Sequence, residues 1–196
     1  MCNENRSVEW SGVIFYNTEG TFGMENFRVN LQDILLMDIG TEVRTWFYYD
    51  HVVAEHLLRH PSLFESLTGS IHSHNKMDVF FSPQDFLDLS QNSETHNLYL
   101  SIVVNNSNEI LAKIGHIFHR RSTISSYTFF NDQYGHLVEF PNGEVEKNSK
   151  YCRILDCDVA IEQPDLDADF FKRIEEVKSA PTKNLNDEPE VKLEHY

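Results

Sequence analysis

Apolar, aromatic and β-branched residues recur along the chain in short runs separated by Gly, Asn, Asp and Ser, a pattern typical of strands and turns. These runs predict strands over residues 8–16, 27–40, 44–50, 97–106 and 109–121, a strand that starts after Gly69, and a hairpin over 125–140 with its turn at 131–135. In 27–40 the strand is expected to give way to a loop. A helix fits the same apolar run, because periodicity does not separate the two in so short a segment.

Helical periodicity appears in three other segments. Apolar residues recur at helical spacing over 50–67, where Pro61 is expected to break or kink the helix and Gly69 to end it. A short helix is expected to start at Ser82, and an amphipathic helix is expected over 165–180. Because strands and helices are intermixed, the expected fold class is α/β (α+β), with a mixed β-sheet flanked by helices.

Composition narrows the range of functions. The 196 residues suit one domain, and 31 acidic against 16 basic residues give a formal charge of −15. Nucleic acid is not an expected partner, because phosphate binding needs a basic surface. Three cysteines without a close pair argue against a disulfide framework, and the sequence shows neither a signal-peptide core nor an apolar run long enough for a membrane span. We therefore expect a soluble cytoplasmic protein without a membrane partner.

The negative charge is unevenly distributed. Residues 156–196 contain 12 acidic and 5 basic residues, so about half of the net charge lies in the last fifth of the chain. We expect a folded core over 1–121 and a β-rich, acidic C-terminal extension over 122–180 that consists of a hairpin and a helix packed on the core. A disordered acidic tail is expected over 181–196.

The candidate chemistry lies in one stretch, GSIHSHNKMDVFFSPQDF, residues 69–86. Residues i and i+2 of a strand face the same side, so His72 and His74 can bind one metal ion. Ser82 is a favoured helix N-cap, and Asp85 falls at the third helical position, which turns its carboxylate toward the end of the preceding strand. Two histidines and one carboxylate form a catalytic zinc set that leaves a fourth position for water.

A purely structural interpretation competes with the metal site. A single histidine on a strand is usually a satisfied polar residue, and Ser-x-x-Asp is a capping box that by itself explains Ser82 and Asp85. The joint spacing favours the metal site. Other metal patterns fit less well, because HxHxDH requires Asp where Lys76 stands, HExxH is absent, and a (β/α)8 barrel needs about 250 residues.

The string HSH, followed after seven residues by SPQD, at 72–85 resembles the HxHx7SxxD signature of the JAMM (JAB1/MPN/Mov34) metalloproteases. That family also has a glutamate at the start of an upstream strand, closely followed by a glycine. The stretch VEWSGVIFY supplies Glu9 and Gly12 in this arrangement. The resemblance covers about residues 8–120, and its HxHx7SxxD part is specific.

The resemblance implies an MPN-like mixed sheet and zinc-dependent hydrolysis of isopeptide or peptide bonds, chiefly the removal of ubiquitin or ubiquitin-like proteins from lysine. It implies that His72, His74 and Asp85 bind Zn²⁺, with water as the fourth ligand. Glu9 would then be the general base that passes a proton to the leaving amine, and Ser82 would donate a hydrogen bond to the oxyanion. The expected partner is a protein or peptide substrate, including a ubiquitin-like conjugate.

The chain departs from the family pattern in three places. Eukaryotic members usually have a strand and a helix before the glutamate, but only eight residues precede Glu9, so the first helix is expected to be missing or replaced. No insertion segment of the kind that grips a ubiquitin chain is recognisable, and residues 122–196 have no recognised counterpart. The short N-terminus and the unfamiliar C-terminal part suggest a prokaryotic or viral member.

Two other functions stay open. The same fold serves as a non-catalytic MPN-like scaffold that dimerises or docks partners, in which case the acidic C-terminal region is the functional part. A zinc hydrolase that acts on a non-protein amide is the third hypothesis. The aromatic cluster at 46–49 is expected in the core or on the sheet, with a substrate groove as the alternative, and His56 and His60 are expected to have structural roles.

Overall fold

The computed structural model describes the backbone over residues 8–40, 51–131, 137–161 and 168–179. The strand expected at 44–50 with its aromatic cluster, most of the turn expected at 131–135 and the acidic tail lie outside these residues. None of the helices in the described ranges is long and apolar enough to cross a lipid bilayer.

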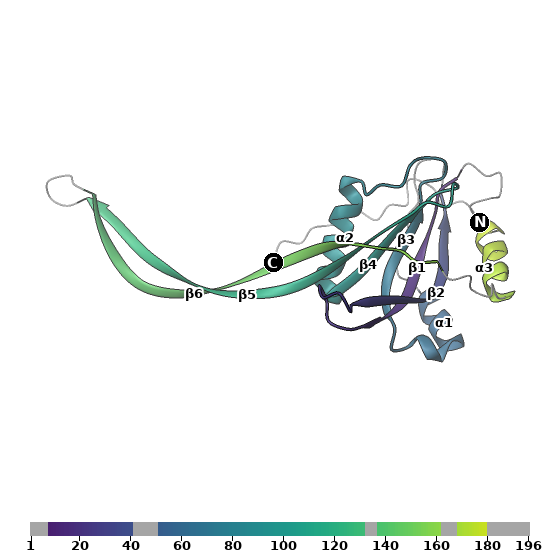
Figure 1. Ribbon diagram of the computed structural model, residues 1–196, viewed down its shortest axis with the longest axis horizontal. Coiled ribbons are helices and arrows are strands. Elements are labelled where there is room, and N and C mark those ends of the chain that lie inside the picture. The colour runs from purple at the N-terminus through teal and green to yellow at the C-terminus, as the bar shows by residue number, and fades with distance from the viewer. Residues whose placement is uncertain (1–7, 41–50, 132–136, 162–167, 180–196) are drawn as a thin grey trace.

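Six strands form one mixed sheet in the order β2-β1-β3-β4-β5-β6 (Figure 1). The strands are β1 Trp10–Glu19, β2 Arg28–Ile39, β3 Leu67–Ser73, β4 Leu98–Val104, β5 Ile110–Asn131 and β6 Leu137–Cys157. β3 and β4 are parallel, and the other neighbouring pairs are antiparallel. The mixed α/β class expected from the sequence is confirmed.

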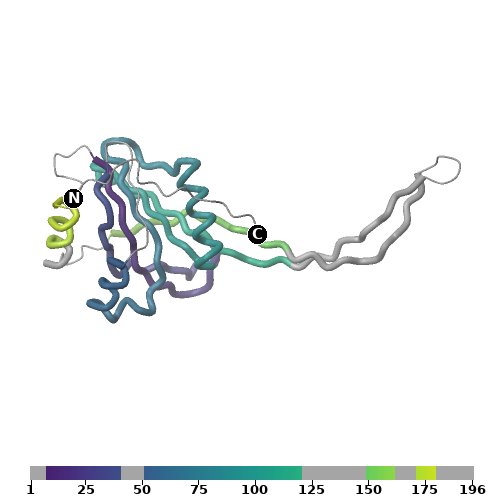
Figure 2. The backbone as a smooth tube through the Cα atoms, turned by 180° about the vertical axis from the view of Figure 1, so that it is seen from behind, coloured from purple at the N-terminus to yellow at the C-terminus, as the bar shows by residue number. Residues whose placement is uncertain are grey.

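Three α-helices accompany the sheet in the described residues, namely α1 His51–Arg59, α2 Pro83–His96 and α3 Ala168–Ser179. α2 connects the parallel strands β3 and β4, which cannot be joined by a tight turn. α3 packs beside β2, at the sheet edge far from the β5–β6 hairpin (Figure 2). There the Nε of Arg173 donates a hydrogen bond of 2.9 Å to the main-chain oxygen of Leu36.

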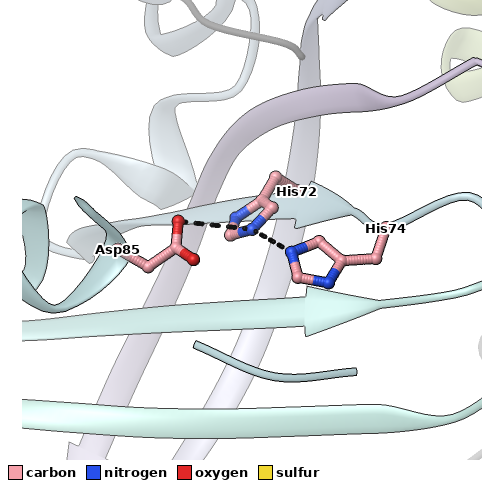
Figure 3. A group of neighbouring side chains, drawn as sticks. All are labelled: His72, His74 and Asp85. Carbon is pink, nitrogen blue, oxygen red and sulfur yellow. Dashed lines mark hydrogen bonds and ion pairs between the residues drawn. The ribbon is translucent and has the colours of Figure 1, made fainter. Parts of the chain in front are cut away.

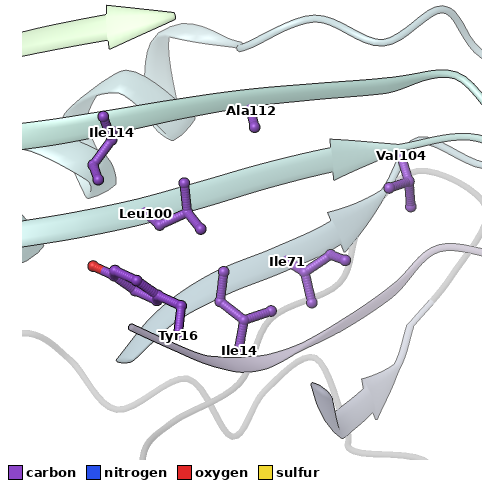
Figure 4. Close-up of a cluster of buried hydrophobic side chains, with 7 residues drawn as sticks. All are labelled: Ile14, Tyr16, Ile71, Leu100, Val104, Ala112 and Ile114. Carbon is purple, nitrogen blue, oxygen red and sulfur yellow. The ribbon is translucent and has the colours of Figure 1, made fainter. Parts of the chain in front are cut away.

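Both faces of the central strands are buried. Along β1, Ile14 and Tyr16 belong to a cluster on one face (Figure 4), whereas Val13 and Phe15 pack under α1 on the other. This period-two alternation with apolar residues on both sides explains why the strand is an almost continuous apolar run. α2 lies on the same face of the sheet as α1. It covers a third apolar cluster, which is built around Leu89. The sheet therefore forms a rigid support for groups at its strand ends.

The helix expected over 50–67 is shorter than its periodicity indicates. α1 ends at Arg59, and a 3-10 turn over Pro61–Leu63 follows. Proline has no N–H with which to continue the α-helical ladder, so the helix stops before it. The helical alternative for 27–40 is wrong, because β2 pairs with β1 along that segment.

Gly69 does not end a helix, as the sequence suggested, but lies inside β3. A Cβ atom at this position would lie 2.2 Å from the carbonyl oxygen of Leu100 and 3.0 Å from Cγ1 of Ile14. Only a residue without a side chain allows β1, β3 and β4 to approach this closely. The glycine is therefore explained by the close approach of neighbouring strands, which is a common reason for a glycine inside a strand.

The β5–β6 hairpin is longer than expected. The sequence suggested a strand ending near residue 121 and a separate hairpin over 125–140, but β5 continues to Asn131 and pairs with β6 throughout. β4 accompanies β5 only as far as His116, so the two strands extend beyond the sheet as a ribbon (Figure 1). The proposed division after residue 121 stays a prediction, and β5 runs across it.

We expect Gly69→Ala to lower the free energy of unfolding by about 1–3 kcal/mol, the range for overpacking a well-packed site. The added Cβ meets the carbonyl oxygen of Leu100, so the parallel β3–β4 pair must separate. Urea denaturation measures the change, with Asn17→Ala on the exposed end of β1 as the control. An unchanged unfolding midpoint in Gly69→Ala would contradict the close approach.

Candidate metal centre

The end of β3 positions both histidines. His72 pairs with Ser11 of β1 on one side and with Val103 of β4 on the other. His74 follows the last residue of β3, and its main-chain N–H donates a 2.8 Å hydrogen bond to the carbonyl oxygen of Val104. The pairing with β4 thus continues as far as His74, and the two imidazoles lie on the same side of the chain, as the i, i+2 spacing predicts.

The first turn of α2 positions the carboxylate. Ser82 is the N-cap, and its Oγ accepts a 3.2 Å hydrogen bond from the main-chain N–H of Asp85. In return, the N–H of Ser82 donates a 2.6 Å hydrogen bond to Oδ2 of Asp85. The capping box expected from the sequence is confirmed, and it leaves Oδ1 of Asp85 directed toward His72. The structural and the metal-site interpretations of these two residues are therefore compatible.

The three side chains converge (Figure 3). The Nε2 atoms of His72 and His74 are 3.2 Å apart, and Nε2 of His72 is 3.5 Å from Oδ1 of Asp85. All three ligand atoms lie within 4.8 Å of one another. Atoms bound to a tetrahedral metal at about 2.0–2.1 Å are about 3.3–3.4 Å from each other. Two of the three separations therefore match this spacing, and the third lies within 4.8 Å, so the group could hold one small metal ion.

A main-chain carbonyl orients the ring of His74. Its Nδ1 lies 3.1 Å from the carbonyl oxygen of Asp78. A carbonyl oxygen only accepts, so Nδ1 carries the proton and Nε2 keeps its lone pair for a metal ion. Sequence reasoning does not find this contact, because a main-chain acceptor leaves no signal in the residue type.

Burial keeps His72 in its neutral form. Removal from water lowers the pKa of His72, the nearby Asp85 carboxylate partly offsets this change, and His74 lowers the pKa further. A neutral imidazole has the free lone pair that a metal ion needs, whereas an imidazolium repels the cation. The local electrostatics therefore suit metal binding at neutral pH.

Glu9 precedes β1 at the same end of the sheet. It is 5% exposed, and its main-chain oxygen accepts a 2.9 Å hydrogen bond from the N–H of Gly40. Burial raises the pKa of Glu9, His74 lowers it in part, and the like charge of Asp85 raises it again. The two side chains that act on this carboxyl group are both members of the metal-ligating group. The structure thus places all three groups within electrostatic reach of one another.

A second histidine pair, His56 and His60, forms a separate, structural arrangement. His56 is bonded to Asp33 through Nε2 and Oδ2 at 2.7 Å, stacks on Phe15 and lies against His60. Across the described ranges, the group of His72, His74 and Asp85 is the one set of three side chains whose geometry allows metal binding. The structural roles expected for His56 and His60 agree with these contacts.

We expect Glu9→Gln to stabilise the metal-free protein at neutral pH. The pKa of Glu9 is raised in the fold, so the folded state binds more protons than the unfolded state between the usual pKa near 4.5 and the folded value. Stability is lost as pH rises through that window, and a neutral amide avoids the loss. Urea denaturation at about pH 4 and about pH 8 measures the difference, with the exposed Glu19→Gln as the control. A gain that is the same at both pH values would contradict this account.

Comparison with known proteins adds no assignment. A scan against protein-family models found no match, and a search of curated proteins found none. The functional argument therefore depends on the residues of the metal-ligating group and on their geometry.

Proposed function

We propose that this protein is a zinc-dependent metallohydrolase of the JAMM type that cleaves isopeptide or peptide bonds. The observation that supports the proposal is the convergence of His72, His74 and Asp85 from the end of β3 and the start of α2. The HxHx7SxxD spacing and the buried Glu9 carboxyl beside this group add to it. The sheet would then be an MPN-like sheet, in which the pair β3–β4 and its crossover helix carry the active site.

The donor set fits zinc. Two imidazole nitrogens and one carboxylate oxygen are ligands that catalytic zinc sites use, and three protein ligands leave one position open. When bound, a zinc ion acts as a Lewis acid that makes hydroxide available near neutral pH. The residues of the chain then supply orientation, proton transfer and charge stabilisation.

Glu9 is suited to move the proton. Its carboxyl group is buried, and burial raises its pKa toward the working range of a general base. As the base, the carboxylate takes a proton from the attacking water and delivers it to the nitrogen of the leaving amine. The same group thus serves first as base and then as acid.

Ser82 is suited to stabilise negative charge. Its Oγ accepts the hydrogen bond from the N–H of Asp85, so its own hydroxyl hydrogen is available to donate. Donation to the oxyanion of the tetrahedral intermediate is the role that we assign to it. The substrate is accordingly a protein or peptide amide, with a lysine-linked ubiquitin-like conjugate as the specific form and the cytoplasm as the expected compartment.

A scaffold function is the second candidate, and the long β5–β6 ribbon favours it. Beyond His116 the two strands extend from the sheet with only each other as strand partners in the described residues. A projecting ribbon is a natural interaction element. An MPN-like protein could dock a partner through it whether or not metal is bound.

We expect one zinc per chain in the purified protein and none in His74→Ala, because loss of one of three protein ligands removes a large part of the affinity. Glu9→Gln should keep the metal, since Glu9 is not among the ligating atoms. Elemental analysis of the untagged proteins measures this, with the exposed His119→Ala as a matched control. Metal-free wild-type protein after zinc loading would reject the proposed enzyme.

We expect Glu9→Gln to lower the rate of hydrolysis of an isopeptide-linked substrate by about 10²–10⁴-fold, as removal of a general base does. Ser82→Ala should lower kcat by about 10²–10³-fold, as the loss of an oxyanion donor does. Ser82→Thr keeps both the hydroxyl and the N-cap and should retain most activity. Equal loss in Ser82→Ala and Ser82→Thr would show that Ser82 does not act through its hydroxyl group.

Shortening the ribbon tests whether metal binding and hydrolysis depend on it. Arg120 pairs with Ser149, so replacement of residues 121–148 by Asn-Gly closes the hairpin there and preserves the six-stranded sheet. We expect unchanged zinc content and unchanged hydrolysis of a short peptide substrate. Loss of hydrolysis with zinc retained would show that the ribbon itself takes part in catalysis.

A further inference from the structure

A tight turn follows the second histidine and carries the carbonyl group that orients it. The N–H of Met77 donates a 2.8 Å hydrogen bond to the carbonyl oxygen of His74, which closes the turn. Asn75 inside the turn has a φ of 53°, in the left-handed region where asparagine is enriched among residues with a side chain. The carbonyl of Asp78, the next residue after Met77, is the one that accepts the hydrogen bond from Nδ1 of His74. The position of the turn therefore determines where that acceptor lies.

Asn105 makes a buried contact to this turn. It is 2% exposed and directly follows the last residue of β4. Its Nδ2 donates hydrogen bonds to the carbonyl oxygen of Met77 at 3.0 Å and to Oε2 of Glu109 at 2.5 Å. Its Oδ1 accepts hydrogen bonds from the main-chain N–H groups of Ser107 and Glu109, each at 3.0 Å. The two hydrogens and the two lone pairs of the side-chain amide are all used.

These partners require an amide at position 105. The main-chain N–H groups of Ser107 and Glu109 donate, and the carbonyl of Met77 accepts, so the side chain needs both an oxygen and an NH2 group. A carboxylate would place oxygen against the carbonyl oxygen of Met77 and a like charge beside Glu109. The connection between β4 and β5 by itself uses the acceptor half of the amide. The donor half is what reaches the turn after His74.

Asn106 adds a second pair of contacts to the same turn. Its main-chain N–H donates a 2.7 Å hydrogen bond to the carbonyl oxygen of Asn75, and its Nδ2 donates a 3.0 Å hydrogen bond to Oδ1 of Asn75. The N–H of His74 already donates to the carbonyl oxygen of Val104, so the contact between the two chain segments continues past the ends of β3 and β4. The turn is thus attached to the end of β4 at Asn75 and at Met77.

We propose that Asn105 and Asn106 form an asparagine clamp that fixes the ring and the proton of His74, so that Nε2 stays open to a metal ion. Neither asparagine is among the ligating side chains, so both are positioning residues that act through the turn and the carbonyl of Asp78. An imidazole without a fixed acceptor at Nδ1 can carry its proton on either nitrogen, and a proton on Nε2 blocks that atom for a metal ion. The inference rests on the proposed function, because it takes the ligating group to bind a metal ion.

The test exchanges donor and acceptor in the buried pair. In the double variant Asn105→Asp, Glu109→Gln, the new amide at 109 donates to the new carboxylate at 105, and the acceptor half of the side chain at 105 is kept. Nothing is then left to donate to the carbonyl oxygen of Met77. Glu109→Gln alone is the matched control, because its amide oxygen still accepts from Asn105 and the bond to Met77 stays. Asn106→Ala is a milder variant that removes the Nδ2 bond and leaves the main-chain bond to Asn75.

Long-range ¹H–¹⁵N NMR of the full-length, metal-free proteins at about pH 8, where an ordinary imidazole is neutral, shows which nitrogen of His74 carries the proton. The wild type and Glu109→Gln are expected to carry it on Nδ1. In the double variant it should be shared with Nε2, and competition with a chelator should show zinc binding about tenfold or more weaker, as for lost outer-sphere contacts. Asn106→Ala should change both readouts in the same direction, with zinc binding about threefold weaker, as for loss of one hydrogen bond.

The position of the proton separates positioning from a purely structural role. Lower stability of the double variant with the proton still on Nδ1 and with unchanged zinc affinity overturns the inference and leaves the hydrolase proposal intact. If the double variant does not fold, Asn106→Ala decides by the same two readouts. A wild-type protein that binds no zinc rejects the hydrolase, whereas a proton that leaves Nδ1 only in the clamp variants still supports the clamp, because that measurement needs no metal.

Discussion

The parallel pairing of β3 with β4 is the constraint on which the candidate site depends. Parallel neighbours require a crossover, so the chain must leave the carboxyl end of β3 and return to the opposite end of the sheet before β4 begins. α2 makes that return, and its N-terminus must therefore lie near the carboxyl end of β3. His72 and His74 stand at the carboxyl end of β3, and Asp85 stands in the first turn of α2. Their meeting follows from the topology.

The site combines groups that oppose one another in the metal-free protein. The Asp85 carboxylate raises the pKa of the buried Glu9 as a like charge, whereas the Nε2 atoms of His72 and His74 share a 3.2 Å hydrogen bond. Such an arrangement costs stability unless a cation relieves it. The surrounding sheet, buried on both faces, is what holds it together. Perturbed pKa values of this kind are common at functional sites.

Much of the site could be predicted from the sequence, and the exceptions have physical causes. The i, i+2 spacing of the histidines and the helix start at Ser82 are local signals, and both appear in the structure. The prediction for Gly69 was wrong because the sequence alone does not distinguish a glycine that ends a helix from one that allows a neighbouring strand to approach closely. The length of β5 was not predicted because its continuation depends on pairing with β6 and not on the residue pattern of β5 itself. The carbonyl of Asp78 leaves no trace in residue type.

The hydrogen bond from the N–H of Ser82 to Oδ2 of Asp85 has a consequence for ion selectivity. One carboxylate oxygen accepts the hydrogen bond at the start of the helix, so Asp85 would offer a metal ion its other oxygen and would bind in a monodentate manner. The chain then provides two nitrogens and a single oxygen. Calcium needs six to eight oxygen ligands and magnesium an octahedron of oxygens, so both are poorly served. Helix capping would thereby bias a metal bound at this centre toward small ions of low coordination number.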